Sequence, residues 1–217
     1  MTSCLLSWII FTPVFMAIIL FLLPKAWTPH FRSWCLVASL LNLLLAMKLW
    51  YSFDGDIAAF QLVELLPWLP SLGISYALGV DGISLPLVML TAVISPIGIL
   101  GTWPKSGNPL KQERFFVVMV LLLQTGMYGT FLATDLFLFY FFWEIVLIPM
   151  FFMIGIWGGQ DRVYATVKFF IYTMAGSLLM LIAILVVYWK AGQTFDVEAI
   201  TRTLADFLAD KPGLQKW

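Results

Sequence analysis

The stretch LFLFYFFWEIVLIPMFFMIGIW, residues 136–157, decides the fold of this chain. As a helix it would extend over about 33 Å, enough to cross the hydrocarbon of a bilayer. Its only ionisable side chain is Glu144, near its middle. A carboxyl group at this depth is costly, so it usually faces other helices, has a partner and serves a function. Pro149 lacks an N–H and leaves the carbonyl of Ile145 without its helical donor. These features predict a bent helix with a hydrated pocket beside Glu144.

The composition of the whole chain is typical of a membrane protein with several spans. Of its 217 residues, 62% are hydrophobic and 11% are charged, whereas about 25% are charged in an ordinary soluble domain. The net charge is zero and no basic run occurs, which argues against a nucleic-acid partner. We therefore expect an all-α fold, an integral membrane bundle.

Six apolar runs are long enough to cross a bilayer, and we expect each to form a transmembrane helix. The first run lacks a basic start and a small-residue cleavage site, so we interpret it as a retained span and not as a signal peptide. Six spans place both ends of the bundle on the same side of the membrane. The expected spans are residues 5–23, 34–51, 83–103, 115–134, 136–157 and 165–189.

The basic residues predict the orientation of these spans. Short cytoplasmic loops retain most Lys and Arg residues, and here the loops after the first, third and fifth spans carry them. The loops after the second and fourth spans hold only Lys48, with several acidic residues. We therefore expect the N-terminus and the segment after the sixth span to face the outside. The residues in the basic loops are Lys25, Arg32, Lys105, Lys111, Arg114, Arg162 and Lys168.

Two segments outside the spans are apolar enough to contact the bundle. The second loop contains ELLPWLPSLGISYALGVDG at 64–82, which Pro and Gly interrupt too often for a span. It is expected to lie on the outer interface or to dock against the bundle. The second segment follows the last span, where apolar residues recur every three or four positions from Asp196, as in an amphipathic helix. We thus divide the chain into a six-span bundle, 1–189, and an amphipathic tail on the outer face, 190–217.

Three further polar residues are candidates for the neighbourhood of Glu144. Gln124 lies at nearly the same depth in the fourth span, so a contact with Glu144 is geometrically possible; the alternative is a hydrogen bond that joins two helices. Lys168 falls in the first turns of the sixth span, with Tyr172 one turn further. Since Lys168 would lie about 15 Å nearer the cytoplasm than Glu144, its side chain cannot reach the acid directly. The alternative role for Lys168 is a charge that extends to the interface.

Three ordered motifs carry a resemblance to a known family. FFWEIVLIPMFFMIGIWGG is followed by ATVKFFIYTMAGSLLMLIA and preceded by ELLPWLPSLGISYALGVDGISLPLVMLT. Together they closely resemble the antiporter-like, proton-translocating membrane subunit of respiratory complex I, NADH-quinone oxidoreductase of the chain M or chain 4 type. The resemblance covers essentially the whole chain and implies the first half of a subunit of roughly fourteen helices. The chain ends where the seventh span should begin, which leaves open whether it is truncated, split or complete.

The resemblance also implies roles for individual residues. Glu144 matches an essential glutamate of a proton half-channel, whose partner in the family is a lysine on the seventh span. Lys168 matches the lysine of the family's TKFFIYT motif, either as a proton relay or as an orienting residue. The proton-translocation site would thus comprise Glu144 and Lys168, with possible support from Gln124, Pro149 and Tyr172.

The same resemblance implies the setting in which the chain works. It would be one subunit of an enzyme without a redox centre of its own, with NADH, FMN, iron–sulfur clusters and quinone bound by other subunits. Its partners would be other membrane-arm subunits, lipid, protons and a segment that supplies the later spans. The membrane would be a bacterial plasma membrane or an organellar energy-transducing membrane. Alternatives are a subunit of a multi-subunit Na⁺/H⁺ antiporter or of an energy-converting hydrogenase. No cofactor or metal site is expected in this chain.

Overall fold

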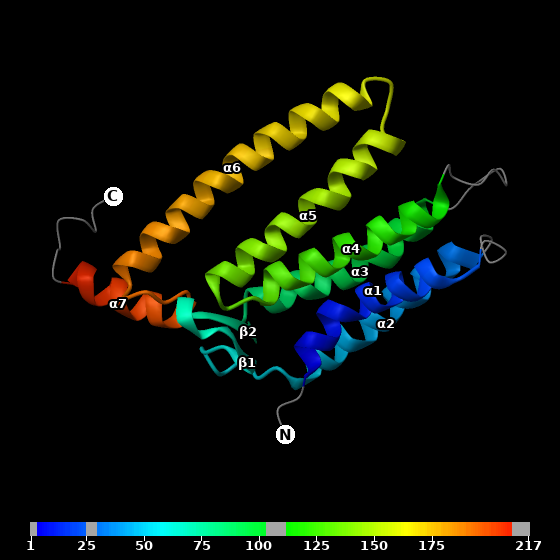
Figure 1. The fold of residues 1–217 in the computed structure, drawn as a ribbon. Helices are drawn as coiled ribbons and strands as arrows, with labels where there is room; N and C mark the ends of the chain where they lie inside the picture. The colour runs from blue at the N-terminus through cyan, green and yellow to red at the C-terminus, as the bar shows by residue number, and fades with distance from the viewer. Residues whose placement is uncertain (1–3, 25–29, 103–111, 210–217) are drawn as a thin grey trace.

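The computed structural model describes residues 4–24, 30–102 and 112–209, and the six expected spans are confirmed within them (Figure 1). All six helices are long and apolar enough to cross a membrane. Their ends lie within about three residues of the predicted ones, because Pro, Gly and charged residues mark the limits of each apolar run. The helices are α1 (Leu5–Leu22), α2 (Phe31–Ser52), α3 (Ser84–Gly101), α4 (Glu113–Leu132), α5 (Leu136–Trp157) and α6 (Arg162–Lys190).

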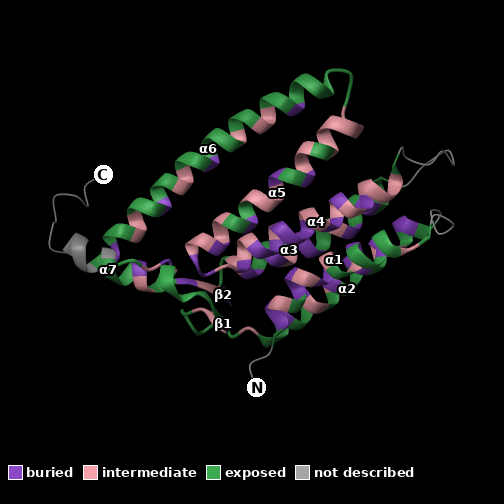
Figure 2. Cartoon of the chain, in the orientation of Figure 1, coloured by how far each residue is buried: buried purple, intermediate pink, exposed green. Residues whose placement is uncertain are grey.

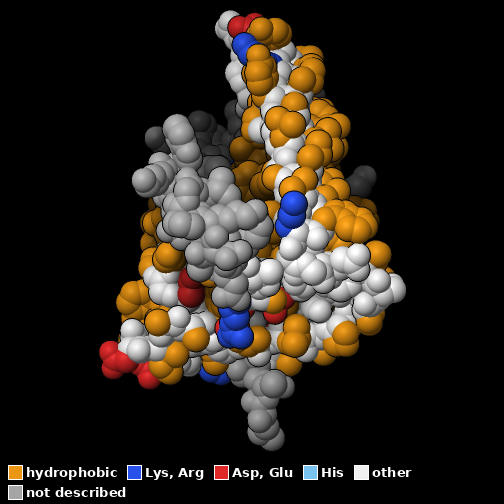
Figure 3. Space-filling model, turned by 90° about the vertical axis from the view of Figure 1, so that its left-hand side faces the viewer, with side chains coloured by type: hydrophobic (Ala, Val, Ile, Leu, Met, Phe, Trp, Pro, Cys, Tyr) orange, Lys and Arg blue, Asp and Glu red, His pale blue; other side chains and the backbone are white. Residues whose placement is uncertain are grey.

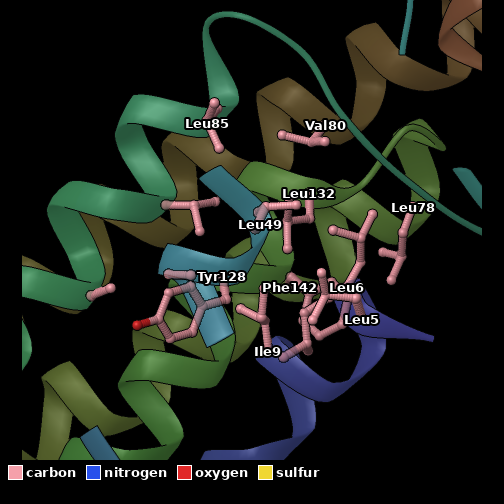
Figure 4. Packing of buried hydrophobic residues seen from close by; sticks show 14 of the residues in the cluster. Leu5, Leu6, Ile9, Leu49, Leu78, Val80, Leu85, Tyr128, Leu132 and Phe142 are labelled. Carbon is pink, nitrogen blue, oxygen red and sulfur yellow. The ribbon is translucent and has the colours of Figure 1, made fainter. Parts of the chain in front are cut away.

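Helix α4 lies at the centre of the bundle. It packs against α1 and α3 on one side and against α5 on the other, while α2 joins α1 and α3. The main apolar core is formed by residues of α1 to α5 together with Leu78 and Val80 from the loop between α2 and α3 (Figure 4). Leu6, Ile9, Tyr128 and Leu132 are fully buried there. This core fixes the position of α5, which carries Glu144.

The second loop forms an antiparallel β-hairpin, which the sequence analysis did not predict. Its strands are β1 (Gln61–Leu69) and β2 (Ile74–Val80), joined through a 3₁₀ turn, Pro70–Leu72, and Gly73. Gly73 has a φ of 68°, a left-handed conformation that glycine adopts without steric cost. β2 faces the bundle and is largely buried, whereas most of β1 is exposed. The expectation that this loop docks against the bundle is therefore confirmed, although its secondary structure was missed.

The hairpin, the turn between α4 and α5 and the segment before α7 (Val197–Ala209) meet at one end of the bundle (Figure 1). The turn between α4 and α5 lies between β2 and the segment before α7 and forms backbone bridges to both. The N–H of Thr134 donates to the carbonyl of Ala77, and the carbonyl of Thr134 accepts the N–H of Val197. The backbones of Asp135 and Asp196 form an antiparallel bridge. A helix forms in the tail over Val197–Ala209, and this junction attaches it to the start of α5. Residues 210–217 of the predicted tail lie outside the described residues.

Helix α6 separates from the first four helices along most of its length and packs against α5 (Figure 1). It is mostly exposed, in contrast to the buried stripes of α1 to α4 (Figure 2). Within α6 the buried residues are Thr166, Ser177 and Ile184. Hydrophobic side chains cover much of this projecting part of the molecule (Figure 3). In a bilayer such a surface suits lipid tails or further apolar helices.

Candidate proton-handling site

Glu144 lies in α5 with its side chain half-buried. Its Oε1 atom is buried and has no hydrogen-bond partner among the residues that the structure describes. Tyr140, one helical turn earlier, interacts with Glu144 and also with Ser177 of α6. A buried carboxyl oxygen without a hydrogen-bond partner is costly, so a donor that approaches this atom would be favourable.

The position of Glu144 follows from how α5 is held at its start and along its length. Asp135 accepts hydrogen bonds from the backbone N–H groups of Phe137 and Leu138, at 2.9 and 3.0 Å, and so caps the helix. Its second carboxyl oxygen accepts the N–H of Ser75 in β2 at 3.1 Å. One buried side chain therefore connects the hairpin to the helix that carries Glu144.

Helix α5 continues through Pro149 as one helix, and Pro149 is buried. Several cavities flank α5, and two of them are lined by a residue next to Glu144 in the sequence, Trp143 or Ile145. One, of about 410 Å³, lies towards α6 and is lined by residues such as Trp143 and Tyr172. The other, of about 570 Å³, lies under the hairpin. Glu144 lines neither of them, so the hydrated pocket beside this acid stays a prediction.

Of the two alternatives for Gln124, the structure supports the hydrogen bond that joins two helices, and no hydrogen bond between Gln124 and Glu144 is found among the described residues. The side-chain nitrogen of Gln124 donates to the hydroxyl of Ser39 in α2 at 2.9 Å. The face of α4 that meets α5 is instead formed by Gly126 and Gly129. Gln124 and Gly126 are about 200° apart around the helix, so equal depth does not place Gln124 towards α5. Depth can be counted from sequence, but the facing direction depends on which helices are neighbours.

Lys168 and Tyr172 lie on the exposed part of α6. The ammonium group of Lys168 lies 5.7 Å from the ring centre of Tyr164, one turn earlier. In the described part of the chain the ion pairs are Arg32–Glu113 and Glu198–Arg202, so no ion pair joins Lys168 to Glu144. This agrees with the depth difference that the sequence predicts.

Sequence reasoning missed two buried carboxylates that organise the bundle. Glu64 in β1 accepts the N–H groups of Leu6 and Ser7, at 2.8 and 3.1 Å, at the start of α1. Glu113 pairs with Arg32 at 2.6 Å, and both side chains are at least nine-tenths buried. The sequence predicts Arg32 only as a basic loop residue and Glu64 only as one of the acidic residues of the second loop. Their burial depends on tertiary contacts that the local sequence does not show.

Two family models together match almost the whole chain. The model described as "NADH-ubiquinone oxidoreductase chain 4, amino terminus" matches residues 5–130. The chain belongs to the chain 4 family of NADH-ubiquinone oxidoreductase. A second model, "NADH:quinone oxidoreductase/Mrp antiporter, TM", matches residues 133–215, which include Glu144 and Lys168. The resemblance inferred from the three motifs is therefore confirmed for the family.

Individual relatives support the same assignment for this chain 4 homologue. It is 39% identical over 218 residues to NADH-quinone oxidoreductase subunit M of Rhodobacter capsulatus, covering 98% of the chain and 41% of the relative. It is 38% identical over 185 residues to F(420)H(2) dehydrogenase subunit M of Methanosarcina mazei, covering 83% of the chain and 36% of the relative. The chain thus spans about two fifths of the length of these relatives.

A solved structure confirms the fold of this chain 4 homologue. The similar chain belongs to respiratory complex I from Thermus thermophilus, with a TM-score of 0.76 and 29% identity. The likeness covers 90% of this chain and 38% of that chain. The six helices therefore have the fold of the matched part of an antiporter-like membrane subunit.

Proposed function

We propose that this chain is a membrane-arm subunit, or the N-terminal part of one, of a proton-translocating NADH:quinone oxidoreductase. Glu144 would take up and release a proton within a half-channel, driven by quinone reduction elsewhere in the complex. The observation that supports this most directly is its buried Oε1, which no described residue satisfies, in the middle of a membrane helix of the chain 4 family. Such an oxygen can accept a hydrogen bond from water or from an incoming cationic side chain.

Tyr140 and Ser177, and separately Lys168, would support this proton step. Tyr140 and Ser177 hold the polar surroundings of Glu144 between α5 and α6. Lys168 would contribute a positive charge near the start of α6, where α5 ends. We further propose that the N-terminus and the tail lie on the outer side of the membrane. A cation that pairs with Glu144 would come from the spans beyond those of this chain. We further propose that NADH, FMN, the iron–sulfur clusters and quinone are held by partner subunits.

The test is Glu144→Gln in the assembled complex, with proton uptake into inverted vesicles measured during NADH oxidation. The amide keeps the size of the side chain but cannot switch between a protonated and an ionised form, so we expect loss of proton pumping. Glu198→Gln is the matched control, because Glu198 is an exposed acid of α7 that pairs only with Arg202 within the described chain. Unchanged pumping per NADH in the Glu144 variant would overturn this role.

A second candidate function is a subunit of a multi-subunit Na⁺/H⁺ antiporter. The description of the matching family model names Mrp antiporters alongside NADH:quinone oxidoreductase, which favours this alternative specifically. It predicts Na⁺-dependent proton flux in vesicles that receive neither NADH nor quinone. The redox-coupled proposal predicts no such flux and full dependence on NADH, so one vesicle preparation separates the two.

A further inference from the structure

A cavity of about 570 Å³ lies between α1 and α5, beneath the β-hairpin. Both helices pack against α4 but not appreciably against each other, so α4 forms the floor of a groove between them. Phe11 and Val14 of α1 line one side of it, and Phe141 and Ile145 of α5 line the other. We call this cavity the hairpin groove.

The β-hairpin closes one end of the hairpin groove. The ring of Trp68 in β1 lies edge-on to Phe141 of α5, with 5.9 Å between the ring centres. The ring of Tyr76 in β2 stacks on Phe11 of α1, with 6.3 Å between the ring centres. The hairpin thus reaches from α5 to α1 at one end of the bundle (Figure 1). A helix that crossed the whole membrane along this groove would meet the hairpin, whereas a shorter or flexible occupant would not.

The hairpin groove reaches about halfway through the membrane. The helix ends beside the hairpin are the start of α1, the end of α4 and the start of α5. Val14, Leu122 and Ile145 lie deepest in the groove, roughly ten residues or about 15 Å from these ends. The hydrocarbon of a bilayer is about 30 Å thick. The groove therefore has the depth of one leaflet, which is the depth that a single acyl chain spans.

The lining of the hairpin groove is suited to hydrocarbon. Its described residues include no charged side chain, and Thr125 and Tyr76 supply its hydroxyl groups. Both hydroxyls already have partners: Thr125 donates to the carbonyl of Leu121 at 3.2 Å, and Tyr76 shares a hydrogen bond of 2.8 Å with Ser7 Oγ. Neither hydroxyl therefore needs a polar ligand. The volume of the groove lies within the range of about 300–1,000 Å³ that is typical of small-molecule sites, and burial of an apolar molecule is favourable.

The hairpin groove is open at its side. Leu66, Trp68 and Phe141 line it and are 62%, 46% and 43% exposed. In a bilayer, lipid tails reach such side chains at this depth. Tryptophan is common where the hydrocarbon meets the headgroups, which agrees with the place of Trp68 at the closed end of the groove. A lipid can thus insert its chain from the side while its headgroup stays at the interface.

We propose that an acyl chain of a phospholipid, from the leaflet on the hairpin side, occupies the hairpin groove. The chain runs from Trp68 at the headgroup level towards Val14 and Ile145 near the bilayer centre. It fills the space that separates α1 from α5. The site recognises hydrocarbon, since the described lining offers no charged residue to bind a headgroup. The inference needs only the membrane location of the helices and does not rest on the proposed proton transfer.

Photo-crosslinking of the assembled complex tests this site. The complex is placed in phosphatidylcholine nanodiscs in which one acyl chain of the lipid carries a diazirine, and the cross-linked residues are identified by mass spectrometry. We expect lipid adducts on Trp68 and Phe141. The variant Val14→Trp places an indole ring in the groove and should reduce these adducts several-fold. Undiminished adducts in this variant, or none on the lining residues of the unaltered complex, would overturn the proposal.

Ile19→Trp is the matched control for the cross-linking experiment. Ile19 lies on the same helix and is exposed, but it does not line the groove, since it is turned by about 140° from Val14 around the helix axis. Its replacement should leave the adducts on Trp68 and Phe141 unchanged. If Val14→Trp prevents assembly, a cryo-EM map of the unaltered complex in the same nanodiscs decides: we expect continuous, unbranched density along the groove. A protein segment in this place, or an empty groove, would contradict the inference.

Discussion

Phe142 of α5 lies directly against Gly129 of α4, where its ring occupies the place of a β-carbon. One turn earlier on α4, a β-carbon at Gly126 would lie 2.5 Å from a methyl group of Val146. The two glycines thus form a groove that receives two large side chains of α5. Small residues allow such close approach, which in membranes replaces the hydrophobic effect as a source of helix association.

Gly129→Ala should therefore separate α4 from α5. The added methyl group would overlap the aromatic ring of Phe142, and overpacking of this kind costs about 1–3 kcal/mol. We expect a lower melting temperature of the purified complex and less assembled subunit. Gly98→Ala in α3 is the control, because a β-carbon there meets nothing within 4 Å. Equal melting temperatures for the two variants would show that α5 can shift without cost.

The buried Arg32–Glu113 pair gives a second prediction. Arg32 also donates to the carbonyl of Thr102 at 2.6 Å, so it joins the start of α2 to the end of α3 and to the start of α4. Glu113→Gln leaves a buried charge without its counter-ion and should cost about 3–5 kcal/mol. Replacement of both residues by methionine should recover much of this loss, because no lone charge remains. Thermal denaturation of the single and double variants measures the difference, and an equally unstable double variant would argue against charge as the cause.

The sequence predicted the spans well and their mutual arrangement poorly, for a physical reason. A run such as 136–157 shows its own length and polarity, which suffice to predict α5. The direction of Gln124 depends on a neighbour, α2, that is distant in the chain. The hairpin was missed because Pro67, Pro70 and Gly73 suggested an irregular loop, whereas its strands are stabilised by pairing and by contact with the bundle. At the candidate site, Glu144 could be selected from sequence, but the interactions of Tyr140 with Glu144 and with Ser177 could not.

Asp135 should be critical for attaching the hairpin to α5. Asp135→Ala removes the cap of α5 and leaves the N–H of Ser75 without its acceptor, and the loss of a cap alone costs about 0.5–2 kcal/mol. Asp135→Asn keeps one oxygen for the cap and should be milder. We expect the order wild type, Asn variant, Ala variant in melting temperature. If the Ala variant were as stable as the Asn variant, the cap would not be the important contact.

The charge of Asp135 also predicts a pH dependence. Burial raises the pKa of this carboxyl above its ordinary value, against the effect of its backbone hydrogen bonds with Leu138, Ser75 and Phe137, and the nearby Asp196 raises it further. An acid with a raised pKa binds its proton more tightly in the folded state, so its charged form costs stability at neutral pH. This cost is lost as the pH falls through the raised pKa towards the ordinary one. When the pH is lowered from 7 to about 4.5, the melting temperature of the wild type should therefore rise more than that of the Asn variant, which has no carboxyl group at this position.

Lys168 allows a relay to be distinguished from a fixed positive charge. Its side chain is exposed and lies over the ring of Tyr164, and no ion pair holds it in the described chain. A fixed charge survives Lys168→Arg but not Lys168→Met, whereas a relay fails in both, because a guanidinium does not release its proton. Since Lys168 lies near the start of α6, we expect the arginine variant to keep most of the NADH-driven proton flux. In the methionine variant we expect this flux to fall several-fold. Lys190→Met, at the opposite end of α6, is the control and should leave the flux unchanged. Equal loss in both Lys168 variants would identify Lys168 as a relay.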